Sequence, residues 1–354
     1  MIQFLQAQHG DAFFLKLHRG ENYGTVVVDG GPGINARLNP FIKEVEALEH
    51  IDLMVLTHHD DDHIAGIKRY FEKHRNDESL KVSNVWANCA PNIQINNSPN
   101  VSAQQAYTLS EVLNDLFEKE LLVWRADIVA GEVIEFPFCE IEIISPKDNV
   151  FNEFQAQYKT MVGNAIEETL GVNVANELVN DDINTSLHEL AKTEPKPPTL
   201  NKYNEAANMS SIAFIVRSDD MSALMLGDAY PQQICEYLYS KGYSKAMKLK
   251  VDFVKISHHG SERNTSSELL DLIDCNKFII STNGGIGNSK HPSRKTIARI
   301  LCHPERDYSS TIHLYFNYPR ERIEIIGKTV FNDQMDCDSN FECHFFDNPM
   351  NTLN

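Results

Sequence analysis

The chain has 354 residues, enough for one large domain with insertions, and its hydrophobic content of 42% is ordinary for a globular protein. Its net charge of −18 argues against broad, sequence-independent contact with nucleic acid, although a narrow cleft in which metal ions supply positive charge is compatible with it. Seven cysteines without short paired spacing predict free thiols in a reducing cytoplasm, and no apolar run approaches the roughly 20 residues of a membrane span.

The first 30 residues have the pattern of a β-hairpin. Apolar runs at 13–15 and 26–28 flank a polar turn, and the second run ends in Asp29, followed by a glycine-rich turn. The first residues have neither the basic segment nor the long apolar stretch of a signal peptide. We therefore expect a cytoplasmic protein with no membrane partner. A helical pattern follows at 35–50.

Residues 56–66 carry the most informative pattern in the chain. They follow an apolar run at 51–56, typical of a buried strand, and precede a segment that reads as the start of a helix. Four side chains of this strand-to-helix turn can point into one small volume: His58, Asp60, Asp62 and His63. Imidazole with carboxylate suits zinc, manganese or iron, and the absence of cysteine argues against a closed structural zinc site. Four ligands within six residues are enough for two metal ions to share.

This stretch resembles the His-x-His-x-Asp-His motif of the metallo-β-lactamase superfamily, with Asp60 in place of the second histidine. The variant is similar to that of the nuclease domain of ComEC-type competence proteins and of phosphorylcholine esterase relatives. The resemblance implies an α/β fold (α+β in some schemes), a four-layer αββα sandwich of two similar halves. It also implies that Asp29 orients the turn by hydrogen bonding without being a ligand. A carboxylate at Asp60 makes the site harder and more tolerant of manganese.

The middle of the chain completes one half of this fold and adds an insertion. A strand at 82–86 ends near Asn88, where the superfamily often has a further metal-binding histidine that this chain lacks. A helix at 102–122 and a hairpin over 133–146 follow. Residues 148–207 are polar, with helical runs around 158–170 and 183–191 and a proline-rich end, and we expect a helical insertion or cap within the domain.

Three apolar strands of the second half each lead to a polar residue. The run at 223–226 ends in Gly227-Asp228, and the resemblance assigns Asp228 the role of the carboxylate that bridges two metal ions. The run at 251–256 leads to His258-His259-Gly260, similar to a signature of the ComEC-like branch. One histidine should bind metal and the other should face substrate phosphate; we predict His258, the first after the strand, as the ligand. His291, in a loop after the strand at 277–283, is expected to contact substrate or donate a proton. The competing interpretation at each position is an ordinary turn or loop residue.

The remaining residues predict a helix at 296–301 and closing strands at 311–316 and 322–326. We expect one domain over residues 1–354, with residues 302–354 as a β-rich C-terminal extension. Cys337 and Cys343 lack histidines at finger-like spacing, so we expect no zinc finger there.

Together these patterns predict a hydrolase with two divalent ions, zinc or manganese, about 3.5–4 Å apart. Asp62 would bind metal and orient the metal-bound hydroxide, and His259 or His291 would stabilise developing charge or protonate the leaving group. By resemblance the substrate is the phosphodiester of DNA or RNA, which also suggests a bacterial defence effector acting with a protein partner encoded by a neighbouring gene. The alternatives are a small-molecule phosphodiesterase or esterase, favoured by the acidity, and a non-catalytic scaffold. The sequence indicates no particular oligomeric state.

Overall fold

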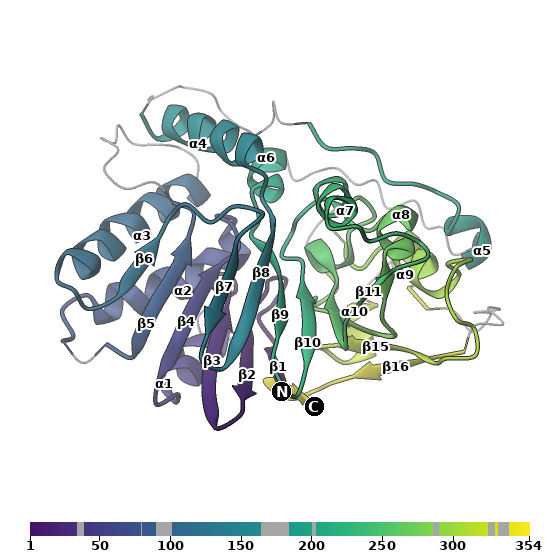
Figure 1. The fold of residues 1–354 in the computed structure, drawn as a ribbon, viewed down its shortest axis with the longest axis horizontal. Helices are drawn as coiled ribbons and strands as arrows, with labels where there is room; N and C mark the ends of the chain where they lie inside the picture. The colour runs from purple at the N-terminus through teal and green to yellow at the C-terminus, as the bar shows by residue number, and fades with distance from the viewer. Residues whose placement is uncertain are drawn as a thin grey trace.

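Two β-sheets face each other at the centre of the computed structural model, and helices cover their outer faces (Figure 1). The structure describes residues 1–33, 39–78, 80–89, 101–163, 184–199, 203–285, 290–324, 330–331 and 340–354. Three buried apolar clusters fill the two helix–sheet interfaces and the space between the sheets. This confirms the predicted α/β class and the four-layer αββα sandwich.

In the described residues the first sheet has seven strands, in the order β17-β1-β2-β3-β4-β5-β6. Their bounds are β1 (Ile2–Leu5), β2 (Phe13–Arg19), β3 (Asn22–Val28), β4 (Ile51–Leu56), β5 (Val82–Ala87), β6 (Val123–Arg125) and β17 (Met350–Leu353). The predicted hairpin is confirmed, since β2 and β3 pair antiparallel. β4 is buried on both faces: Met54 and Leu56 pack toward the helices, and Leu53 and Val55 toward the other sheet.

The second sheet, over the part of the chain that the structure describes, has eight strands in the order β16-β15-β14-β12-β10-β9-β8-β7. Their bounds are β7 (Val133–Phe136), β8 (Cys139–Ser145), β9 (Ala213–Arg217), β10 (Ser222–Met225), β12 (Phe253–Lys255), β14 (Lys277–Ile280), β15 (Ile312–Phe316) and β16 (Phe341–Phe345). A separate pair joins β11 (Leu249–Lys250) to β13 (Ile273–Asp274). β10, β12 and β14 are parallel neighbours, so their carboxyl ends meet at one edge of the sheet.

Helices α1 to α3 lie on the outer face of the first sheet, and α7 to α10 on the opposite side of the molecule (Figure 1). The bounds are α1 (Phe41–Glu46), α2 (Asp61–His74), α3 (Val101–Glu118), α7 (Pro231–Ser240), α8 (Ser267–Asp271), α9 (Arg294–Leu301) and α10 (Arg320–Ile323). The predicted helix at 35–50 is shorter in the structure, where the described residues form only α1, and residues 34–38 lie outside the described residues. None of the helices in the described residues is both long and apolar enough to cross a membrane.

The segment predicted as an insertion contributes α4 (Asp148–Gly163), α5 (Leu187–Leu190) and α6 (Tyr203–Met209). Helices α4 and α6 pack together above the sandwich, and α5 packs against α9 on the far side (Figure 1). Arg299 of α9 holds the segment after α5 by donating a hydrogen bond to the Thr193 carbonyl at 2.6 Å. Much of the predicted run at 158–170 and the start of the run at 183–191 lie outside the described residues, so the insertion stays a prediction.

The C-terminal part joins both sheets. β15 and β16 extend the second sheet, and β17 pairs antiparallel with β1 at the edge of the first, which brings the two chain ends together (Figure 1). One prediction here is wrong: the segment from Arg320 to Ile323 is helix α10, where we expected a closing strand at 322–326. Arg320 and Glu324 form an ion pair at 3.0 Å. Side chains four residues apart are neighbours on the surface of a helix, whereas along an extended strand they are too far apart to pair. Residues 325 and 326 lie outside the described residues.

Candidate metal centre

The candidate site lies where strands of both sheets end. His58 follows β4, Asp228 follows β10, and His259 follows β12 in a short 3₁₀ turn, Ser257–Gly260. Helix α2 begins directly after β4 and carries Asp62 and His63 in its first turn. Gly66 lets this helix approach the loop after β3, because a Cβ on Gly66 would lie 2.0 Å from the Gly30 carbonyl oxygen. The strand-to-helix turn is therefore held in one position.

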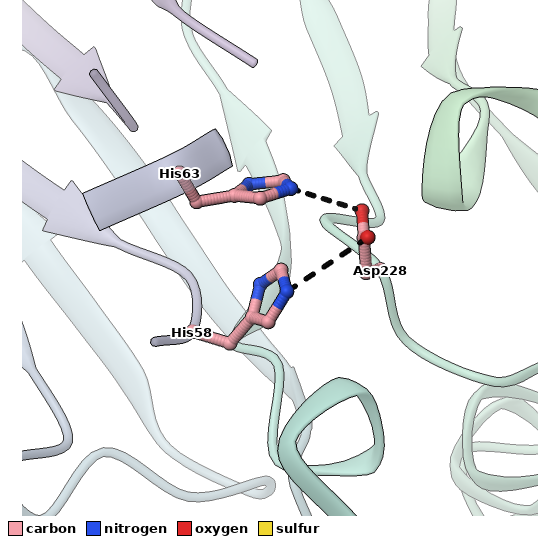
Figure 2. Close-up of side chains that lie close together, drawn as sticks. All are labelled: His58, His63 and Asp228. Carbon is pink, nitrogen blue, oxygen red and sulfur yellow. Dashed lines mark ion pairs between the residues drawn. The ribbon is translucent and has the colours of Figure 1, made fainter. Parts of the chain in front are cut away.

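His58, His63 and Asp228 point toward one another from different elements (Figure 2). The Nε2 atom of His58 lies 3.8 Å from Asp228 Oδ2, and that of His63 lies 3.5 Å from Asp228 Oδ1. All three side chains are buried, yet both Nε2 atoms and Asp228 Oδ1 have no hydrogen-bond partner among the described residues. Asp60 Oδ2 lies 3.6 Å from His58 Nε2. Buried polar atoms without partners are costly, so this arrangement fits a shared cation.

A second group shares His63 with the first. The ligand atoms of Asp62, His63 and His259 lie within 4.8 Å of one another. His259 Nε2 is 3.1 Å from Asp62 Oδ2, and His63 Nε2 is 3.9 Å from the same oxygen. Because the two groups overlap at His63 and are both close to Asp228, the donor set is large enough for the two predicted ions.

The second nitrogen of each of these imidazoles is held by a neighbour. His63 Nδ1 lies 2.8 Å from Asp29 Oδ2, His58 Nδ1 lies 3.1 Å from Thr57 Oγ1, and His259 Nδ1 lies 3.0 Å from the Ser281 carbonyl oxygen. Asp29 also accepts hydrogen bonds from the backbone N–H and the hydroxyl of Thr57, both at 2.8 Å. This confirms that Asp29 orients the turn. Such outer hydrogen bonds fix the tautomer and direction of metal-binding histidines.

The two adjacent histidines after β12 have a strained backbone. His258 has φ of 49° and His259 φ of 53°, both in the left-handed region that costs about 1–2 kcal/mol per residue with a side chain. The amide of His258 donates to the Gly227 carbonyl at 3.0 Å, which ties this turn to the one that carries Asp228. Gly227 also has positive φ, and a Cβ there would lie 2.4 Å from Ser211 Oγ. Strain of this kind persists where the surrounding structure imposes it, often at functional sites.

The side chains of His258 and His259 have different surroundings. The side chain of His259 is 4% exposed and belongs to the group with Asp62 and His63. That of His258 is 27% exposed, with Nε2 3.7 Å from Asp228 Oδ2. The His291 ring lies beside both, with centroid distances of 5.3 Å to His258 and 6.3 Å to His259. All the predicted site residues therefore converge, and which of the two histidines is the ligand stays a prediction.

Sequence reasoning missed a buried ion pair behind the site. Lys255 and Asp11, each 1% exposed, form this pair, and Lys255 also donates to the Gly227 carbonyl at 2.8 Å. Its Nζ lies 3.8 Å from Asp228 Oδ1. Burial opposes ionisation of Asp11, but Lys255 and His259 outweigh it and lower the pKa of Asp11 to about 2. A lysine within the apolar run of β12 was the available signal, because a fully buried lysine needs a carboxylate partner.

Two further residues, His59 inside the first motif and Asn88 just after β5, have structural roles. His59 Nε2 lies 3.1 Å from the Asn88 carbonyl oxygen, and its ring centroid is 5.2 Å from those of Phe154 and Tyr158 on α4. Burial lowers the pKa of His59 to about 4, so the ring is neutral. The Asn88 amide exchanges two hydrogen bonds with the backbone of Ile128. These contacts tie α4 to the strand-to-helix turn. They also engage the Asn88 side chain with backbone groups outside the metal-ligand cluster.

Without a cation, the carboxylates hold protons on the clustered histidines. Burial lowers the pKa of His63, but Asp228 and Asp29 outweigh it and raise that pKa well above the usual value. Burial likewise opposes the charged form of His259, while Asp11 and Asp228 raise its pKa to about 10. Histidine must be neutral to bind a metal, so cation binding here competes directly with these protons.

No protein-family model matches the chain, and no curated protein matches its sequence. Solved structures match it distantly. CmlA, a diiron β-hydroxylase from Streptomyces venezuelae, is 12% identical over 87% of this chain and 48% of its own, with a TM-score of 0.39. The metallo-β-lactamase fold protein YhfI from Bacillus subtilis is 9% identical over 89% of this chain and 84% of its own, with a TM-score of 0.38. Zn²⁺-bound PqqB from Methylobacterium extorquens is 10% identical over 78% and 88%, with a TM-score of 0.39.

The chain spans about half the length of the CmlA structures that it matches, 44% and 48%. All these identities lie under 25% and all the TM-scores under 0.5. At this distance the comparisons assign no activity, and the αββα fold is established by the order of this chain's own strands and helices.

Proposed function

We propose that the chain is a metal-dependent hydrolase that cleaves phosphodiester bonds. One observation carries the proposal: the buried Nε2 atoms of His58 and His63 and the Oδ1 atom of Asp228 face one another without hydrogen-bond partners among the described residues. Imidazole and carboxylate donors of this kind suit zinc or manganese. Divalent ions held here would polarise a phosphoryl oxygen and lower the pKa of a bound water.

We assign the ligands to two positions that share Asp228. One is formed by His58 and Asp60, and the other by Asp62, His63 and His259. The assignment of His259 differs from the sequence prediction, and it is supported by the 3.1 Å distance from His259 Nε2 to Asp62 Oδ2 and by the burial of that ring. His258 then faces substrate, in keeping with its greater exposure.

His258 and His291 are the groups best placed to act on substrate. Their rings lie 5.3 Å apart beside the cluster, with His258 Nε2 3.7 Å from Asp228 Oδ2. A protonated imidazole in this position can hydrogen-bond a phosphoryl oxygen or deliver a proton to the leaving oxygen. Asp62, whose Oδ2 lies 3.1 Å from His259 Nε2, can also orient the attacking water.

The favoured substrate class is DNA or RNA, by the resemblance of the motifs to ComEC-type nuclease domains. A second candidate, a small phosphodiester or ester, is favoured by charge. The net charge of the chain is −18. Two cationic side chains that come soon after site residues in the sequence are already paired with carboxylates: Arg263 with Glu205 at 3.2 Å, and Lys295 with Glu262 at 2.8 Å. A long polyanion depends on cationic side chains along its path, and cations already paired with carboxylates contribute little to its binding. A small ester would be bound by the metal cluster and does not need them.

The test starts from metal content. Protein stripped with chelator and reloaded with Mn²⁺ or Zn²⁺ should hold about two ions in the proposed centre and should hydrolyse bis-p-nitrophenyl phosphate. Single-stranded DNA, duplex DNA, RNA and a carboxylic ester then separate the two substrate classes. Asp62→Asn should abolish activity, whereas Asp61→Asn, the same change one residue away, should not, because Asp61 is engaged by Gln105 at 2.7 Å. A protein that takes up no metal, or that hydrolyses none of these substrates when loaded, would overturn the proposal and leave the scaffold interpretation.

A further inference from the structure

A separate group of metal-ligating side chains lies at one edge of the eight-stranded sheet, on edge strand β16 and its neighbour β15. His313 is on β15, and Glu342 and His344 are on β16. We infer that these three side chains form a separate site for a transition-metal ion such as Zn²⁺ or Cu²⁺. Their ligand atoms, His313 Nδ1, Glu342 Oε2 and His344 Nε2, lie within 4.8 Å of one another.

The spacing of the three atoms is close to that around a shared ion, with the two imidazole nitrogens at hydrogen-bond distance. His313 Nδ1 is 3.0 Å from His344 Nε2 and 3.5 Å from Glu342 Oε2, and His344 Nε2 is 3.7 Å from Glu342 Oε2. Ligands about 2.0–2.2 Å from a tetrahedral zinc ion lie roughly 3.3–3.6 Å from one another. Two imidazoles with one carboxylate is a donor set of open zinc sites, in which the fourth position is left for water.

The sheet itself brings these side chains together. β15 and β16 are parallel, with His313 opposite Glu342 and Tyr315 opposite His344. Since neighbouring residues of a strand point to opposite faces, all four side chains share one face. Leu314 and the adjacent Cys343 point the other way, into the cluster under the helices. The convergence therefore follows from strand register rather than from mobile surface side chains.

Tyr315 holds the two imidazoles in place. Its ring stacks on His344 at a centroid distance of 4.6 Å and an angle of 16°, and on His313 at 6.2 Å and 22°. The side chains of His313, His344 and Glu342 are 24%, 34% and 61% exposed, so an ion can reach them from solvent. Rings fixed by packing and open to solvent are what a preformed surface metal site needs.

This site is distinct from the proposed hydrolytic centre. His313 is the second residue of β15 and lies beside Lys277, whereas Asn317, just after the other end of β15, donates to Ser281 Oγ at 3.2 Å, next to the carbonyl that holds His259. The four residue steps from His313 to Asn317 span about 13 Å along the strand. An ion bound here would tie edge strand β16 to β15, so its role would be to fasten this edge strand to the sheet.

Equilibrium dialysis against Zn²⁺ tests the site. His344→Phe keeps an aromatic ring on Tyr315 and removes the ligand nitrogen, and we expect it to bind about one ion fewer than wild type. Glu342→Gln, at an exposed position, should weaken the same site. Hydrolysis should be unchanged in both. His50→Phe is the matched control, because His50 is a surface histidine with one carboxylate nearby, Asp52 at 3.7 Å.

Electron paramagnetic resonance with Cu²⁺ gives an independent measurement: the wild-type spectrum minus that of His344→Phe should show a copper coupled to two imidazole nitrogens, because the hydrolytic centre contributes equally to both spectra. Unchanged zinc stoichiometry in His344→Phe, or an equal loss in His50→Phe, would overturn the inference and leave a hydrogen bond between two imidazoles. Asp228→Ala should retain this site, so failure of the proposed hydrolytic centre and failure of this one give different results.

Discussion

Replacing Lys255 with methionine tests whether the buried cation behind the metal cluster holds its carboxylates together. Lys255 is 1% exposed, pairs with Asp11, and has Nζ 3.8 Å from Asp228 Oδ1. Methionine has a similar length and a flexible apolar side chain, so it can fill the same space without the charge. The change leaves Asp11 buried without its lysine partner, and the remaining cationic neighbour is His259, whose Nδ1 lies 3.4 Å from Asp11 Oδ1.

Removing one partner of a buried ion pair costs about 3–5 kcal/mol, because the remaining charge is desolvated and uncompensated. Set against a typical free energy of unfolding of about 5–15 kcal/mol, the loss is large. It corresponds to a rise of roughly 10²- to 10⁴-fold in the unfolding equilibrium constant. The double variant Asp11→Asn/Lys255→Met should recover part of this loss, because it leaves no unpaired charge at the pair.

Urea unfolding, followed by the fluorescence of the two tryptophans, measures these differences in chelator. Lys16→Met, an exposed lysine on β2, is the control and should change the free energy of unfolding by less than about 0.5 kcal/mol. With Mn²⁺ or Zn²⁺ bound near Asp228, the cost of Lys255→Met should be smaller, since the ion supplies positive charge. A free energy of unfolding for Lys255→Met within about 0.5 kcal/mol of wild type, or strictly additive effects in the double variant, would refute the reasoning.

Three further predictions concern the cluster. Asp228→Ala should lower the metal content of the proposed hydrolytic centre below about two ions and remove most hydrolysis while circular dichroism stays that of the folded protein; wild-type turnover would show that Gly227-Asp228 is only a turn. His259→Ala should lower metal content and turnover together, whereas His258→Ala should lower turnover alone, and the reverse pattern would restore His258 as the ligand. Because carboxylates raise the pKa of His63, and that of His259 to about 10, both rings are protonated at pH 7 in the metal-free protein. Metal binding should therefore release about two protons in weak buffer and weaken as pH falls, and absence of release would show that the rings are already neutral.

The sequence was informative wherever a site residue follows an apolar strand. His58 after β4, Asp228 after β10 and the histidine pair after β12 could each be placed, because such runs mark buried strands, and strands of both sheets end at the site. The partner of Lys255 could not be placed in the same way. Asp11 lies in a turn after β1, and only the packing of the two sheets brings it to the end of β12.

The choice between His258 and His259 depends on backbone geometry that no periodicity reports. Sequence order favours His258 as the ligand, since it is the first histidine after the strand, but both residues adopt positive φ, and this turns the second ring toward Asp62 and His63. Two consecutive left-handed residues cost together about 2–4 kcal/mol, which the turn tolerates because His258 N bonds to the Gly227 carbonyl and His259 Nδ1 to that of Ser281. Those carbonyls belong to the turns after β10 and β14, so the direction of the His259 ring is set by three neighbouring strand ends at once. A sequence pattern along one segment cannot contain that information. The backbone strain at His258 and His259, in contrast, is visible in the structure and marks the site.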